Sequence, residues 1–221
     1  MGIGPLIRRA FGRHERLVSE MYRGMFVDLD AFVASIRHNV AAPATVLEIG
    51  CGDGMVTERL ASAFPNSILT GIDICAQPGR LFRGDQSRVR FLRTSPEELS
   101  ASETARYQLL IISDVLHHVP HHSWQQFLAG AAQLLARGGT LVLKDWVREP
   151  TPAYAFGYLS DRLITADRIR YPDEAELKSI AERTFGTGAL RFEFRVRPWH
   201  CNLALGILPQ PDRGTAAGER D

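Results

Sequence analysis

The sequence predicts an α/β fold in which a doubly wound, mostly parallel sheet of seven strands has helices on both faces. Short apolar runs alternate along the chain with segments whose apolar residues recur at helical spacing. The run at residues 107–113 is apolar almost throughout, as in a strand covered on both faces of a parallel sheet. The first run, residues 46–49, ends at glycines in positions 50, 52 and 54, which is typical of a tight turn from a strand into a helix.

The length and composition fit one globular domain with a sizeable core. The chain has 221 residues, of which 45% are hydrophobic and 23% are charged. A net charge of +1 gives no global field that would attract nucleic acid or an anionic membrane. The three cysteines have neither zinc-site spacing nor the pattern of a disulfide framework. Without a membrane-spanning run or a secretory leader, the expected location is cytoplasmic.

Amphipathic helices are expected over the first 40 residues. The Arg-rich stretch 1–20 has Leu6, Ile7, Ala10 and Phe11 on one helical face, which favours packing on the domain over a membrane surface. The segment 20–40 is predicted to be one helix. Its apolar stripe consists of Met21, Met25, Leu29, Phe32, Val33 and Ile36.

The predicted strands follow the glycine turn in order. The second, residues 67–73, ends in Asp73, and the third spans residues 89–93. The fourth, residues 107–113, leads into Asp-Val-Leu-His-His-Val-Pro, where open α/β sheets bind ligands. A helix over residues 123–137, stopped by two glycines, precedes a fifth strand at residues 140–145.

The C-terminal part is expected to differ from the alternating pattern. Residues 147–172 are rich in proline and aromatic side chains, and a helix opens at 172–177 with proline and acidic residues. Residues 190–196 alternate as in an antiparallel strand, and residues 201–207 form the last strand. The composition of residues 209–221 predicts a disordered tail.

Three stretches have a characteristic composition. They are Val-Leu-Glu-Ile-Gly-Cys-Gly-Asp-Gly at 46–54, Val-Leu-His-His-Val-Pro at 115–120, and Leu-Leu-Ala-Arg-Gly-Gly-Thr-Leu-Val-Leu at 134–143. Together they resemble class I S-adenosylmethionine-dependent methyltransferases of the small-molecule type. The glycine pattern is neither the dinucleotide fingerprint nor a phosphate-binding P-loop. The resemblance is firm over residues 44–146, where the motifs lie, and over 173–208 it rests only on the order of the predicted helix and strands. It implies a methyltransferase domain over 41–208 that uses S-adenosylmethionine, with residues 1–40 as a helical lid over the cofactor pocket.

The resemblance also implies a set of cofactor-binding residues. The turn residues, with the acidic Glu48 before them, would lie against the methionine part of the cofactor. Asp73 would bind the ribose hydroxyls, and an acid about 20 residues beyond the glycines has this role in dinucleotide folds as well. The full predicted set is Glu48, Gly50, Gly52, Asp53, Gly54, Asp73, Ile74, Ser95 and Asp114.

Ser95 marks a departure from the family pattern. Family members commonly carry Gly-Asp-Ala where this chain has Thr94, Ser95 and Pro96, and the Asp holds the adenine amino group. Ser95 is a weaker partner, and Pro96 has no N–H to donate. The same residues also have the pattern of a helix start, with Ser95 as N-cap and Glu98 completing a capping box.

A general base, if the acceptor needs one, is expected among the polar residues after the fourth and fifth strands. His117 and His118 are ranked first, ahead of His121, His122, Asp114 and Asp145. A His-His pair also occurs in this fold with unrelated substrates, so either ring can have a packing role. No metal is expected, because adjacent histidines point in different directions and no acid or cysteine cluster joins them.

Substrate contacts are expected from the lid and from residues 147–172, which would cap the substrate side of the pocket. The predicted substrate-binding residues are Tyr22, Tyr154, Tyr158 and Arg162. Core packing by the lid aromatics and an ordinary cap helix with a local ion pair are the competing interpretations.

The sequence therefore predicts a methyltransferase that acts on a small molecule, with O-methylation favoured over C- or N-methylation. No Asp/Asn-Pro-Pro-Tyr/Phe motif of exocyclic-amine methylation follows the fourth strand. One alternative is an RNA or protein methyltransferase that uses the arginines at 80, 83, 88, 90 and 93. Another is a protein that binds the cofactor or its product without methyl transfer. The acceptor and the oligomeric state stay open.

Overall fold

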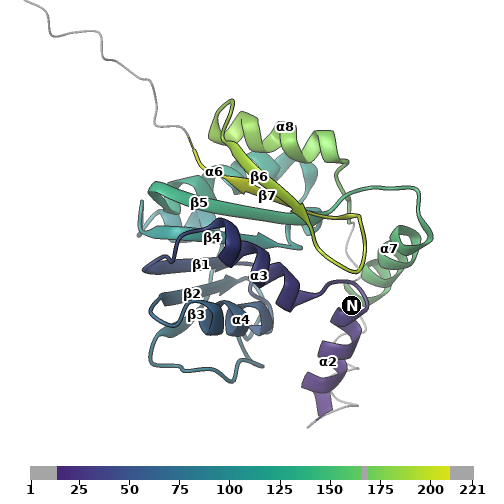
Figure 1. Ribbon diagram of the computed structural model, residues 1–221, viewed down its shortest axis with the longest axis horizontal. Coiled ribbons are helices and arrows are strands. Elements are labelled where there is room, and N and C mark those ends of the chain that lie inside the picture. The colour runs from purple at the N-terminus through teal and green to yellow at the C-terminus, as the bar shows by residue number, and fades with distance from the viewer. Residues whose placement is uncertain (1–13, 166–168, 210–221) are drawn as a thin grey trace, which may run out of the picture.

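Seven strands form one sheet in the order β3-β2-β1-β4-β5-β7-β6 (Figure 1). The computed structural model describes residues 14–165 and 169–209, apart from the side chains of 153 and 160–165. Strands β1 to β5 are parallel, whereas β7 pairs antiparallel with both β5 and β6. The predicted fold class is therefore confirmed. The strands are β1 (Thr45–Ile49), β2 (Ile68–Asp73), β3 (Val89–Arg93), β4 (Tyr107–Ser113), β5 (Leu135–Trp146), β6 (Leu190–Arg195) and β7 (Asn202–Ile207).

Helices cover both faces of the sheet, so its inner strands are buried on each side, whereas the edge strands β3 and β6 are partly exposed. Helices α3 and α4 pack on one face, and α5, α6 and α8 pack on the other. Helices α2 and α7 lie together beyond the carboxyl ends of β1, β4 and β5 (Figure 1). The helices are α2 (Glu15–Gly24), α3 (Leu29–Asn39), α4 (Met55–Ala63), α5 (Pro96–Ser100), η2 (Leu116–His118), η3 (His121–Ser123), α6 (Trp124–Leu134), α7 (Pro152–Thr165) and α8 (Glu174–Phe185).

The single helix predicted over residues 20–40 is wrong, because the chain breaks it into α2 and α3. Asp28 starts α3 as an N-cap, with its carboxylate accepting a 2.9 Å hydrogen bond from the N–H of Ala31. The two halves of the predicted apolar stripe therefore have different surroundings. Phe32 and Ile36 are fully buried, whereas Met21 and Met25 are exposed on the outer side of α2.

The predicted end of the helix before β5 is also wrong. Helix α6 ends at Leu134 rather than at residue 137, and β5 already begins at Leu135. Leu135 pairs with Tyr107 of β4, and the register then shifts before Thr140 pairs with Leu109. Gly138, at a φ of 74°, lies within this irregular part of the strand. The two glycines thus mark a bulge-like irregularity in the strand rather than the helix stop.

Two local sequence signals are confirmed at helix starts. Ser95 and Glu98 form the predicted capping box at α5, and the Asp173 carboxylate caps α8 by accepting from the N–H of Glu176. No helix in the described part of the chain is long and apolar enough to cross a membrane. The predicted apolar face at Leu6–Phe11 and, from residue 210 onward, the predicted disordered tail lie outside the described residues.

Candidate active site

The turn between β1 and α4 brings the backbone close to neighbouring segments. Gly50 has a φ of 77°, and a Cβ built there would lie 2.2 Å from the side chain of Val115, so no larger residue fits. Gly52 has a φ of 51°, but nothing lies within 4 Å of where its Cβ would be. The turn is therefore closed on the side of β4 and open at Gly52, where a ligand can approach the backbone.

Asp73, the last residue of β2, is bonded to this turn. One carboxylate oxygen accepts a 2.8 Å hydrogen bond from the N–H of Gly52, and the other accepts one of 2.8 Å from Cys75 N–H. Each carboxylate oxygen has two acceptor sites. Asp73 therefore fixes the turn and keeps acceptor capacity, as binding a vicinal diol requires.

A cavity of about 260 Å³ opens at the carboxyl ends of β1, β4 and β5. The glycine turn forms one wall, α2 and the segment after it form a second, and the ends of β4 and β5 with α7 form a third. The lining residues are Ser19, Tyr22, Arg23, Phe26, Val27, Leu29, Glu48, Gly50, Cys51, Gly52, Val56, Ser113, Asp114, His117, His118, Trp146, Gly157 and Tyr171.

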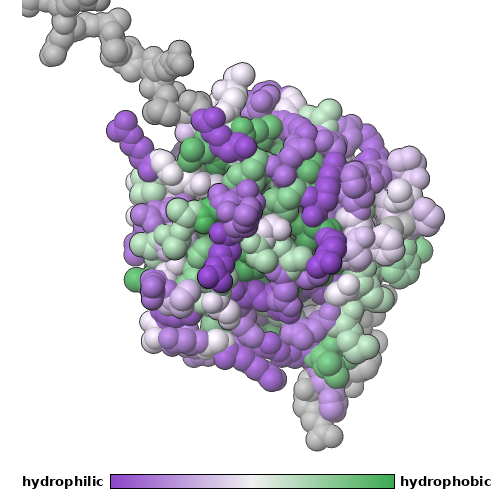
Figure 2. Space-filling view, viewed as in Figure 1, coloured by the Kyte–Doolittle hydropathy of each residue, from purple (hydrophilic) through white to green (hydrophobic). Residues whose placement is uncertain are grey.

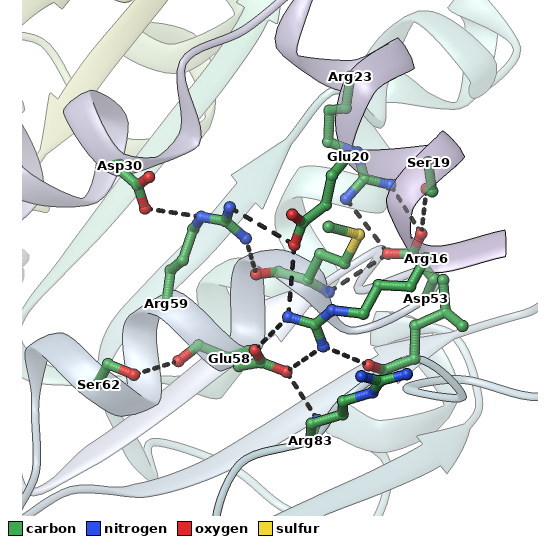
Figure 3. Close-up of polar contacts among 12 residues, drawn as sticks. Arg16, Ser19, Glu20, Arg23, Asp30, Asp53, Glu58, Arg59, Ser62 and Arg83 are labelled. Carbon is green, nitrogen blue, oxygen red and sulfur yellow. Dashed lines mark hydrogen bonds and ion pairs between the residues drawn. The ribbon is translucent and has the colours of Figure 1, made fainter. Parts of the chain in front are cut away.

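Polar contacts hold α2 across the glycine turn (Figure 3). The guanidinium of Arg23 donates to both oxygens of Asp53, at 3.2 and 3.0 Å, and the Ser19 hydroxyl donates to the same carboxylate at 3.1 Å. Arg16 donates to Glu58 on α4 at 2.9 and 2.6 Å. Helix α2, called the lid below, thus lies over the glycine turn, and Asp53 serves as its attachment point in the turn.

Glu48 has an unusual environment for a carboxyl group. It lines the cavity but is 3% exposed, and the hydroxyl of Thr57 donates a hydrogen bond to it. Burial raises the pKa of Glu48 to about 8, against the smaller lowering effect of the Thr57 hydrogen bond and the positive charge of Arg23. A cation placed in the cavity would favour the ionised form of Glu48.

Lys144 and Asp114 form an ion pair behind the cavity wall. Lys144, in β5, is fully buried, and its ammonium donates to the two oxygens of Asp114 at 2.6 and 2.7 Å. Asp114 has a φ of 57°, a conformation that is unfavourable for a residue with a side chain. A buried ammonium without a partner is costly, so the fold favours the conformation in which the Asp114 carboxylate reaches Lys144. The ion pair thereby stabilises the unfavourable backbone conformation of Asp114 after β4.

His117 and Asp145 form a buried dyad. The Nδ1 atom of His117 lies 2.6 Å from Asp145, which also accepts hydrogen bonds from the N–H groups of Trp146 at 2.7 Å and His117 at 3.2 Å. Burial works against ionisation of Asp145, yet the hydrogen bond and the positive charge of a protonated His117, the charge of Lys144 and the N–H of Trp146 lower its pKa overall. When the His117 ring is neutral and donates Nδ1–H to the ionised Asp145, the lone pair of the ring is on Nε2. The neutral ring is then a proton acceptor at Nε2.

The other histidines of this segment differ from His117. His118 also lines the cavity, with its ring centroid 4.1 Å from that of His117. His121 lies on the surface, 3.0 Å from Glu176 of α8 and against the ring of Trp124. In the described part of the chain, no group of three His, Cys, Asp or Glu side chains could hold a metal ion.

The predicted site residues divide into two groups. The first group lines the cavity and consists of Tyr22, Glu48, Gly50, Gly52, Asp114, His117 and His118. The second group does not line it and consists of Asp53, Gly54, Asp73, Ile74, Ser95, Tyr154 and Tyr158. The side chain of Arg162, in α7, lies outside the described residues. The hydroxyl of Ser95 is engaged in its helix cap, and Ile74 is 75% exposed beside Asp73.

Several cavity residues had no predicted role. Tyr171 is buried against His117, with ring centroids 4.7 Å apart, and Gly157 lets α7 approach Trp146 so closely that a Cβ there would lie 2.7 Å from the ring. No motif in the sequence marks either residue. Trp146 follows directly after the predicted fifth strand, and this position was its only signal. Asp145, the last residue of that predicted strand, was a candidate base; it contacts His117 and does not line the cavity.

Comparison with known proteins agrees with this geometry. A family described as a methyltransferase domain matches residues 21–184. The chain belongs to this family. The match extends from the lid helix through the glycine turn and the dyad into α8.

Relatives of this methyltransferase domain act on different acceptors. Trans-aconitate 2-methyltransferase of Methylobacterium nodulans is 32% identical over 52% of this chain and 44% of its own length. A ubiquinone biosynthesis O-methyltransferase of Saccharophagus degradans is 31% identical over 52% of this chain and 48% of its own. The chain thus spans about half the length of these curated relatives.

A solved structure shows the same fold. The 1,6-didemethyltoxoflavin-N1-methyltransferase of Burkholderia thailandensis, bound to its substrate and S-adenosylhomocysteine, superposes with a TM-score of 0.65. The alignment covers 90% of this chain and 87% of that one at 20% sequence identity. The names of these proteins give different acceptors, so family membership does not specify the acceptor.

The environment of Glu48 makes a prediction about stability. Folding raises the pKa of this carboxyl group from its ordinary value to about 8. The free energy of unfolding of the protein therefore decreases as the pH rises through that interval. The free energy of unfolding of Glu48→Gln minus that of the wild type should therefore increase between about pH 5 and pH 8.5, by on the order of 3 kcal/mol. Urea denaturation at both pH values measures it.

Glu58→Gln is the control for this experiment. The hydrogen bond from Arg16 lowers the pKa of Glu58 against a smaller effect of burial, so its ionisation is complete below this pH interval. The corresponding difference for Glu58→Gln should stay constant between the two pH values. A constant difference for Glu48→Gln would contradict the buried, protonated Glu48.

Proposed function

We propose that this domain binds S-adenosylmethionine and transfers its methyl group to a hydroxyl oxygen of a small molecule. The His117–Asp145 dyad carries the proposal, because it places a proton acceptor in the wall of the cavity that the glycine turn opens. O-methylation needs such a base at the acceptor hydroxyl. The family and the fold support methyl transfer in general.

The residues around the turn fit this cofactor. The open backbone at Gly52 and the carboxylate of Asp73 suit the adenosyl side, with Asp73 accepting from the ribose hydroxyls. Glu48 provides a carboxyl group beside the cavity that a cationic ligand would ionise. Arg23 is the one Arg or Lys among the described residues that line the cavity, so it suits the carboxylate of the methionine part.

The chemistry then depends on alignment and proton removal. When bound, S-adenosylmethionine supplies an electrophilic methyl group on a sulfonium centre. The lid and the glycine turn hold the reacting groups in line, and such positioning can account for much of the rate. His117 takes the hydroxyl proton at Nε2, while Asp145 fixes the ring and stabilises its protonated form.

The arginines favour a small-molecule acceptor over RNA. Arg88 donates to the carbonyls of Ala61, Phe64 and Ser67, and Arg90 donates to Glu103 and Tyr107. Arg80 pairs with Glu15 of the lid at 2.5 Å. Three of the five arginines are therefore engaged in contacts within the fold and are not free to bind a phosphate backbone.

The role of Arg23 can be tested with two ligands. Arg23→Met should weaken binding of S-adenosylhomocysteine by about 10-fold or more, since a hydrogen bond to a charged group contributes roughly 1.5–3 kcal/mol. Methylthioadenosine, which lacks the amino-acid part, should bind the wild type and the variant within about 2-fold. Isothermal titration calorimetry measures both affinities.

Arg80→Met is the matched control, because it breaks the lid contact with Glu15 without lining the cavity. It should leave both affinities within about 2-fold of the wild type. If Arg23→Met weakens both ligands equally, Arg23 only tethers the lid to Asp53 and does not bind the carboxylate.

Substitutions in the dyad test the proposed reaction. His117→Asn and Asp145→Asn should each lower methyl transfer by about 100-fold or more, the usual contribution of general-base catalysis. Binding of S-adenosylhomocysteine should not change, because neither residue belongs to the cofactor side. The assay follows labelled methyl groups from S-adenosylmethionine into a small-molecule extract.

His121→Asn provides the control, because His121 is a surface histidine that contacts Glu176. It should retain activity within about 2-fold of the wild type. Full activity of His117→Asn would show that the transfer needs no base at this position. It would then favour an acceptor that is already a strong nucleophile.

A further inference from the structure

The part of the cavity beyond the glycine turn is walled by aromatic rings from separate segments. Tyr22 and Phe26 come from the lid region, Trp146 from the end of β5, and Tyr171 from the segment before α8. Phe26 lies 5.8 Å from Trp146 between ring centroids, and Trp146 lies 6.2 Å from Tyr171. Tyr171 in turn lies 4.7 Å from the His117 ring. The rings thus lead directly to the proposed base.

The structure keeps these rings close together. Gly157 is buried in α7 against Trp146, and a Cβ there would lie 2.7 Å from the indole ring. Phe156, the preceding residue, stacks on Phe26 with a centroid distance of 5.6 Å and an angle of 14°. Helix α7 therefore brings its backbone against one ring and its own aromatic side chain against another.

The outer side of this region is apolar as well. Six of the eight large hydrophobic residues that are exposed in the described part of the chain lie on α2, α7 and the loops next to them. They are Leu17, Met21, Met25, Phe156, Leu159 and Trp199. Figure 2 shows hydrophobic surface at this side of the molecule, where Figure 1 places α2 and α7.

From this arrangement we infer that the acceptor is a planar hydroxyaromatic compound whose ring packs on the aromatic wall of the cavity formed by Phe26, Trp146 and Tyr171. The inference rests on the proposed function and specifies its substrate class. Aromatic side chains favour stacked or edge-on contacts with other rings, beyond the gain from burying apolar area. His117 lies next to this wall, 4.7 Å from Tyr171 between ring centroids, so a hydroxyl on the acceptor ring can face the proposed base.

The charges near the cavity support an acceptor without several carboxylates. Among the described residues that line it, Arg23 is the one Arg or Lys, and its guanidinium already contacts Asp53. Glu48 and Asp114 add carboxyl groups to the wall. A tricarboxylate in this part of the site would therefore bury carboxylates that have no cationic partner there apart from Arg23.

Matched probes can test the ring preference. The complex of the full chain with S-adenosylhomocysteine is titrated with 2-naphthol, with decahydro-2-naphthol as its saturated counterpart, and with citrate. We expect 2-naphthol to bind at least about 10-fold more tightly than the saturated alcohol, since contacts with the rings of the cavity wall add to burial. Citrate should show no binding at millimolar concentration.

Two Phe→Leu variants locate the preference. Phe26→Leu should reduce the ratio of the affinities for 2-naphthol and decahydro-2-naphthol to about 3 or less. The affinity for S-adenosylhomocysteine should not change. Phe192→Leu, in β6 outside the cavity, should keep the wild-type preference. The unchanged product affinity also shows that each variant is folded.

Three results would overturn the inference while the proposed function stands, provided that S-adenosylhomocysteine binds. They are equal binding of the two alcohols, no binding of 2-naphthol at millimolar concentration, and tighter binding of citrate. An equal effect of the two Phe→Leu variants would likewise contradict a ring site at Phe26. Failure of S-adenosylhomocysteine to bind the wild type would instead reject the proposed function.

Discussion

The hydrogen bond from the Gly52 N–H to the carboxylate of Asp73 connects the two parts on which the site depends. It joins the turn after β1 to the end of β2, so the shape of the turn and the position of the acid are fixed together. Gly50 cannot carry a side chain because Val115 occupies that space, and this contact fixes the turn on its other side, against the loop after β4. The lid is bonded to the same turn through Asp53, and the cavity exists because these segments meet.

The end of β5 arranges the opposite wall by placing two charged residues in succession. Neighbouring residues of a strand point to opposite faces of the sheet. Lys144 accordingly holds Asp114 on one side, and Asp145 holds His117 on the other. Both partners belong to the loop after β4, so this loop is attached to β5 at two points, and Asp145 fixes the orientation of the His117 ring.

Much of this arrangement could be predicted from local sequence patterns. The individual strands of the sheet, the glycine turn, the acid at the end of β2 and the cap at Ser95 all depend on residues close in sequence. The break between α2 and α3 was missed because the apolar spacing continues across it, while the Asp28 cap decides the structure. Contacts between distant segments, such as Tyr171 with His117 or Arg23 with Asp53, have no local pattern and follow only from the fold.

The central claim is that the turn and Asp73 together bind the adenosyl group, and calorimetric titration of S-adenosylhomocysteine tests it most directly. Asp73→Asn keeps the size of the side chain but removes the charge that accepts from a ribose diol. The account predicts micromolar binding by the wild type and a loss of about 30-fold in the variant, the equivalent of roughly 2 kcal/mol for a hydrogen bond to a charged group. Equal affinities for the two proteins, or no binding by the wild type, would contradict it.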